Sequence, residues 1–111
     1  MTNVEHYTYR VRWSAEDEAC VATVAEFPSL SWIAETSVEA TQGIRDLVIG
    51  VLEDMEQTGE TPPQPFGERS YSGNFMVRVP PELHRQLAIE AAEQNVSLNR
   101  LATTRLVGTR N

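Results

Sequence analysis

The stretch NFMVRVPPELH, Asn74 to His84, alternates polar and apolar side chains for six residues and then continues into two prolines. Successive side chains of a β-strand point to opposite faces. One face would hold Phe75, Val77 and Val79, and the other Asn74, Met76 and Arg78. Proline ends a strand but suits the first turn of a helix. The stretch therefore predicts a short strand followed directly by a helix.

Two amphipathic helices are predicted after this strand. The first ends at Gln94, and Asn95 suits the left-handed conformation that closes a helix. Ser97 is expected to cap the second helix. The apolar stripes are Leu83, Leu87, Ala88 and Ala91 in the first helix and Leu98, Leu101, Ala102 and Leu106 in the second.

One strand and two helices cannot close a core alone, because a lone strand leaves its backbone groups unpaired and so short a segment buries little surface. A second copy would solve both problems if Phe75–Val79 paired antiparallel with its own equivalent. The predicted core of this homodimer is Phe75, Val77, Val79, Leu83, Leu87, Leu101 and Leu106. The other face of the ribbon fits the DNA major groove, where asparagine pairs with adenine and arginine with guanine.

The first half of the chain predicts a small sheet and one long helix. Residues 7–13 alternate with a period of two, and residues 19–27 are extended and apolar, so the two are expected to form a hairpin. Residues 30–35 predict a third strand. Residues 38–58 repeat apolar side chains every three or four positions, which is typical of an amphipathic helix. Residues 64–66 are considered as a further edge strand.

Local signals set the ends of the long helix, and alternation indicates which side chains of the second strand share a side. Thr36 and Glu39 have the spacing of a capping box, and Gly59 is suited to end the helix before the prolines of ETPPQP. In the second strand, we expect one side to hold Val21, Thr23, Ala25 and Phe27.

The charge is distributed unevenly along the chain. The formal net charge is −7, but residues 1–69 carry −9 and residues 70–111 carry +2, with arginine as the only type of basic residue besides histidine. The overall charge argues against a general affinity for nucleic acid or anionic membranes.

The single cysteine, Cys20, excludes an intrachain disulfide. With neither a signal peptide nor a bilayer-spanning run, a soluble cytoplasmic protein is expected.

Residues 73–107 resemble the ribbon-helix-helix fold of Arc-type repressors in the alternating strand, the Pro-Glu-Leu helix start and the NVSLN start of the second helix. Together with EFPSLSW-x3-TSVEA and GETPPQP, the whole chain resembles the HicB antitoxin family. The resemblance implies an α+β protein with a partial RNase H-like domain over residues 1–67, built as β-β-β-α with an optional last strand. This domain would bind and mask a small, basic, RNA-cleaving HicA-like toxin. Residues 68–72 would be a hinge, and residues 73–111 would dimerise, bind operator DNA and repress the operon.

The resemblance also implies the DNA-contacting residues. The base-reading positions are Asn74, Met76 and Arg78, and the phosphate-binding start of the second helix is Ser97, Leu98 and Asn99. Free backbone amides and the helix dipole favour an anion at such a helix start.

Two features depart from the family. Met76 stands where relatives often have a polar residue, and Leu30-Ser31-Trp32 replaces the usual Leu-Pro-Gly-Cys turn. Trp32 is equally compatible with a core position and with a partner-binding anchor.

No catalytic residue, metal site or cofactor is expected, so the chain is not predicted to be an enzyme. Asp17, Asp46 and Asp54 lie in a predicted turn and along a helix, without the carboxylate cluster that a two-metal nuclease needs.

Two other functions stay open. One is a stand-alone ribbon-helix-helix regulator whose N-terminal module senses a ligand or builds higher oligomers. The other is an interaction protein that uses the ribbon only to dimerise.

Overall fold

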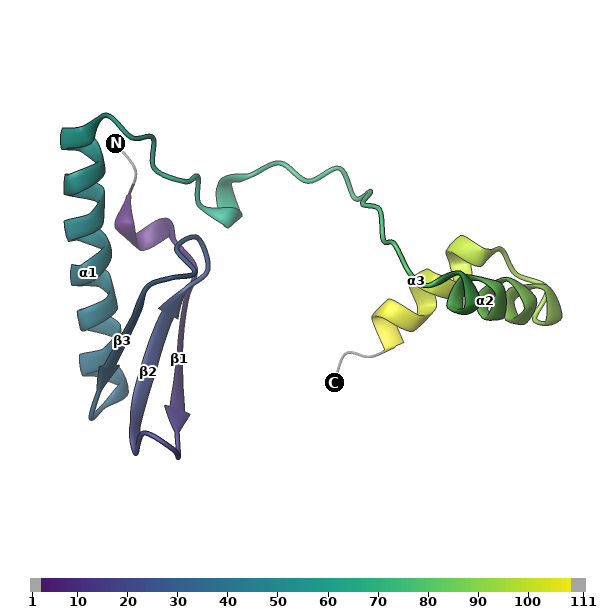
Figure 1. Ribbon diagram of the computed structural model, residues 1–111, viewed down its shortest axis with the longest axis horizontal. Coiled ribbons are helices and arrows are strands. Elements are labelled where there is room, and N and C mark those ends of the chain that lie inside the picture. Colours follow the sequence, from purple (N-terminus) through teal and green to yellow (C-terminus); the bar gives the residue numbers. More distant parts are fainter. Residues whose placement is uncertain (1–2, 109–111) are drawn as a thin grey trace. The chain divides into compact units, whose positions relative to one another are not determined.

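A computed structural model describes the structure of residues 3–108 of the protein. The chain divides into two compact units, of which the first ends at Ser72 and the second begins at Gly73. The first unit has a three-stranded antiparallel sheet with one long helix, and the second has two helices (Figure 1). The predicted α+β class is therefore confirmed.

The sheet of the first unit has the strand order β1-β2-β3. A 3-10 helix, η1 (Val4–His6), precedes β1 (Tyr9–Ser14), which pairs with β2 (Ala19–Val24) as the predicted hairpin. Strand β3 (Ser31–Ala34) pairs with the other edge of β2. Strand β2 is thus central, while β1 and β3 each have one edge without a strand partner among the described residues.

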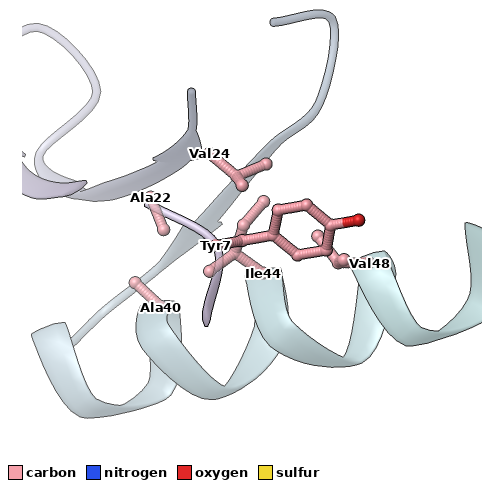
Figure 2. Packing of buried hydrophobic residues seen from close by; sticks show 6 residues of the cluster. All are labelled: Tyr7, Ala22, Val24, Ala40, Ile44 and Val48. Atoms are coloured by element: carbon pink, nitrogen blue, oxygen red, sulfur yellow. The ribbon is translucent and has the colours of Figure 1, made fainter. Parts of the chain in front are cut away.

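Helix α1 (Ser37–Thr58) lies across one face of the sheet, and the core of the unit lies between them (Figure 1). Figure 2 shows the side chains of α1 pointing toward those of β2 and of Tyr7. The buried cluster is Tyr7, Ala22, Val24, Ala40, Ile44 and Val48. The three residues from α1 are four apart in sequence, so they lie on one side of the helix.

Strand β2 ends at Val24, so Ala25 and Phe27, which were predicted to share one side of the strand with Val21 and Thr23, lie beyond it. Ala22 and Val24 face the helix, whereas Val21 lies on the opposite side of the sheet between Arg12 and Ile33 of the neighbouring strands. Both faces of β2 are apolar over Ala19–Val24, so alternation alone does not distinguish them.

The predicted ends of α1 are confirmed. The Glu39 amide donates to Thr36 Oγ1 at 3.2 Å, and this hydroxyl donates to the Glu39 carboxylate at 2.9 Å. Gly59 has a φ of 77°, which is the left-handed region that glycine adopts without strain. The Glu60 amide then bonds the carbonyl of Met55 at 2.9 Å, so the last carbonyls of the helix are satisfied.

The segment after α1 returns to the sheet without forming the edge strand considered for residues 64–66. Phe66–Glu68 is instead a 3-10 helix, η2. The carboxylate of Glu26, which is buried, accepts hydrogen bonds from the amides of Phe66 and Thr8, both at 2.9 Å, and from the Thr8 hydroxyl at 3.0 Å. The Tyr7 hydroxyl donates to the carbonyl of Pro63 at 2.9 Å. The two bonds that reach Pro63 and Phe66 hold this segment against the rest of the first unit.

We expect Glu26→Gln to lower the free energy of unfolding by about 1–3 kcal/mol at neutral pH, because one charged acceptor would be lost among three donors. Burial alone would raise the pKa of Glu26, but the hydrogen bonds from Phe66 and Thr8 outweigh it and lower the pKa below its ordinary value. The bonds therefore stabilise the fold above the ordinary carboxyl pKa, and this contribution is lost as the pH falls through the lowered value.

Urea denaturation of both proteins, repeated from about pH 7 to about pH 3, measures this effect. The difference between wild type and Glu26→Gln should shrink toward the acidic end of the series. Glu16→Gln, an exposed turn residue, is the matched control and should change stability little at any pH. A constant difference across the series would show that the charge on Glu26 does not stabilise the fold.

The second unit contains α2 (Pro81–Glu93) and α3 (Leu98–Gly108). Asn95 has a φ of 58°, as predicted, and the amides of Asn95 and Val96 bond the carbonyls of Ala92 and Ala91. This is the Schellman arrangement that ends α2 before the short turn into α3. No helix within residues 3–108 is both long enough and apolar enough to cross a membrane.

Candidate nucleic-acid interface

Residues 74–80, the predicted strand and its first proline, carry no regular secondary structure in the single chain. The segment precedes α2, whose first residue is Pro81. Phe75 is 77% exposed, Met76 81% and Val77 61%. Apolar side chains on both faces of the predicted strand are thus accessible, and the pairing with a second chain stays a prediction.

The residues predicted to form the dimer core divide into two groups. Leu101 of α3 is 4% exposed, and Ala91 of α2, the helix that α3 contacts, is also buried. Leu87 is half-buried. The remaining members are exposed in the single chain, namely Phe75, Val77, Val79, Leu83 and Leu106. The two helices therefore bury only a small part of the apolar surface of their unit.

The start of α3 has the predicted cap. Ser97 Oγ accepts a hydrogen bond from the Arg100 amide at 3.0 Å, and the Ser97 carbonyl accepts from Leu101 at 3.0 Å. Ser97 and Asn99 are exposed, while Leu98 is half-buried. The cap occupies one of the orphan amide groups at this helix start, and the helix dipole adds partial positive charge there.

The arginines of the second unit differ in their partners. Arg85 pairs with Glu82 at 2.8 Å on α2, and Arg105 of α3 pairs with Glu90 of α2. Arg78 and Arg100 form no ion pair with any residue in the described part of the chain. Because Arg100 lies in the first turn of α3, it adds positive charge beside Ser97. Sequence reasoning did not select it, although its place three residues after the cap was a usable signal.

Trp32 is partly exposed, at 44%, and its indole lies on α1. A Cβ atom built on Gly43 of α1 would lie 2.0 Å from Trp32 Nε1, so the missing side chain makes room for the ring. Trp32 therefore packs against the helix with one side while part of its surface stays accessible. Trp32 is therefore not a fully buried core residue, and its role as a partner-binding anchor stays a prediction.

The acidic residues of the first unit do not assemble into a metal-binding cluster. Within residues 3–108, no three histidine, cysteine, aspartate or glutamate side chains are close enough together to hold a metal ion. Strand β1 contains no carboxylate, Asp17 bonds Ser14 in the turn that follows, and Asp46 bonds Gln42 on α1. Cys20 is half-buried and packs against the core.

Residues 54–106 match the sequence model of the HicB family, so this stretch of the chain is similar to that family. The match begins in the last turns of α1, continues through the segment that connects the two units, and ends within α3. It therefore includes all the predicted DNA-contacting residues. Comparisons with curated proteins and with solved structures find no match.

Proposed function

We propose that the protein is a HicB-type antitoxin that masks a small, basic, RNA-cleaving toxin and represses its own operon. The observation that carries this proposal is the HicB match over residues 54–106. In this proposal, the first unit is a partial RNase H-like domain that has a binding function and no catalytic one. The second unit is one half of a ribbon-helix-helix repressor that acts on operator DNA in the cytoplasm.

The exposed apolar residues of the second unit support the dimer. Phe75, Val77 and Val79 alternate with Asn74, Met76 and Arg78, and each of the three is exposed in the single chain. A small soluble domain rarely leaves so many large apolar side chains in water unless a partner covers them. Antiparallel pairing of two such segments would satisfy their backbone groups and would place these three side chains over the helices of both chains.

The charges of the two units support their separate partners. Residues 1–69 carry a net charge of −9, which repels RNA but attracts a basic protein that itself binds RNA. Residues 70–111 carry +2, and a dimer doubles this charge. Because arginine contacts with phosphate release counterions, we expect operator affinity to fall as the salt concentration rises.

Co-expression with a small basic protein, if one is encoded beside this chain, tests the antitoxin function. The neighbour's product alone should stop growth, this chain should restore growth, and the two should co-purify. If the chain binds operator DNA but neither retains the neighbour's product nor relieves its toxicity, the stand-alone regulator is the better description. A dimer that lacks DNA affinity would favour the simple interaction protein.

Arg78→Ala is expected to weaken operator binding by about 1–3 kcal/mol. A bidentate pair between arginine and guanine in the major groove favours the correct base over a wrong one by about this free energy. Fluorescence anisotropy with a labelled operator fragment at fixed salt measures the change. The dimer should persist, since Arg78 is predicted to lie on the face of the ribbon opposite Phe75, Val77 and Val79.

Arg85→Ala is the matched control. It removes the same charge from the same unit, but the Arg85 guanidinium is bonded to Glu82 on α2 and lies outside the predicted ribbon. Operator affinity should then change by less than about 0.5 kcal/mol. Equal losses for the two variants would indicate a general charge effect and would contradict base reading by Arg78.

A further inference from the structure

A groove of about 900 Å³ opens on the first unit between η1, the C-terminal half of α1 and the segment that follows α1. Its apolar lining comes from Val4 of η1, Ile49 and Leu52 of α1, and Pro62. Ile49 is 41% exposed although it lies on the long helix of the unit. The groove thus contains apolar surface that the chain's own residues leave partly in water.

Four glutamates form most of the polar lining of this groove, together with Asn3 and His6. Its carboxylates are Glu53, Glu56, Glu60 and Glu68. Two of them have partners nearby, because Glu68 pairs with His6 at 2.6 Å and Glu60 accepts a hydrogen bond from the Thr58 hydroxyl at 3.0 Å. Glu53 and Glu56 form no ion pair within residues 3–108, and no arginine lines the groove.

Glu53 and Glu56 lie near the C-terminal end of α1, where their negative charge destabilises the helix in the chain alone. The C-terminal end of a helix carries partial negative charge, and acidic side chains in the last turns add to it. The last turn of α1 contains no basic residue to offset this repulsion. Because Ile49, Leu52, Glu53 and Glu56 are spaced by three or four residues, the carboxylates stand beside the apolar lining on one side of α1. A cation placed there would relieve the repulsion.

We propose that this groove docks an arginine- or lysine-bearing segment of the partner toxin. The aliphatic stems of its basic side chains would cover Ile49 and Leu52, and their charged heads would meet Glu53 and Glu56. This inference rests on the proposed antitoxin function and names the surface through which it acts. Nucleic acid is a poor occupant, because four carboxylates repel phosphate.

The test compares two double variants of the full chain that remove the same charge. Glu53→Gln with Glu56→Gln neutralises the groove, and glutamine is a good helix former. Glu16→Gln with Glu35→Gln is the control, because both residues are exposed and neither lines the groove. The probe is a short fluorescein-labelled peptide of alternating leucine and arginine. A second peptide with citrulline in place of arginine reports the contribution of the positive charge.

We expect the groove variant to bind the arginine peptide about tenfold more weakly than wild type, and the control less than about twofold more weakly. The citrulline peptide should bind wild type weakly. In an NMR titration of wild type, the arginine peptide should shift the amides around Ile49 and Glu56, which maps the site without any substitution. Equal losses for the two variants, no binding, or shifts confined to residues outside the groove would each overturn the proposal.

Co-purification of the neighbour-encoded toxin with the same variants separates this inference from the proposed function. The groove variant should retain less toxin than the control does. If both variants retain as much toxin as wild type, the antitoxin function stands and the groove is not its docking surface. If wild type binds the arginine peptide in the groove but no toxin, the antitoxin function fails and the toxin is not the occupant.

Discussion

Replacing Ile44 with alanine should lower the free energy of unfolding of the first unit by about 2–5 kcal/mol. Ile44 is fully buried and lies at the centre of the cluster that joins α1 to β2 (Figure 2). The shortened side chain leaves a cavity between Ala22, Val24 and Val48, and close packing on all sides limits how far the surroundings can collapse into it. Such a loss is a large fraction of the total stability of a small domain.

Chemical denaturation followed by tryptophan fluorescence measures this loss, because Trp13 and Trp32 both belong to the sheet of the first unit. Val38→Ala on the same helix is the control, since Val38 is 77% exposed and should change stability by less than about 0.5 kcal/mol. If Ile44→Ala cost no more than Val38→Ala, the core would not lie where α1 meets the sheet.

Local signals in the sequence were sufficient for most elements of the fold. The caps at Thr36, Gly59, Asn95 and Ser97 were identified correctly, because each depends on a few neighbouring residues whose chemistry is visible in the sequence. The hairpin and the long helix followed from apolar side chains repeated at periods of two and of about three and a half.

Long-range contacts could not be predicted in the same way. The Glu26 carboxylate bonds the Phe66 amide across 40 residues, and this bond belongs to the segment that was considered as a strand and is a 3-10 helix. The face of β2 that meets α1 was not predicted either, because both faces of this central strand are apolar and only the position of α1 distinguishes them. The groove likewise joins residues from η1, α1 and η2 that no single stretch reveals.

The candidate DNA interface depends on a contact that one chain cannot make. The sequence predicts which side chains of residues 74–79 share a face, yet in the single chain Met76 and Val77 are 81% and 61% exposed. The two residues are neighbours with opposite predicted roles, since Val77 belongs to the dimer core and Met76 to the DNA-facing side of the ribbon. The same substitution at each position therefore tests the dimer directly.

Val77→Asp is expected to raise the dissociation constant of the dimer by at least about a thousandfold, which is about 4 kcal/mol, because two-fold symmetry would bury two unpaired carboxylates in the joint core. Met76→Asp should leave the dimer intact and weaken operator binding, because its carboxylates would face DNA. Sedimentation equilibrium gives the mass of each variant, and anisotropy gives its operator affinity. If both variants remain dimeric, Val77 is not in the interface. If both dissociate, the two faces of the segment are not distinct and the ribbon arrangement is wrong.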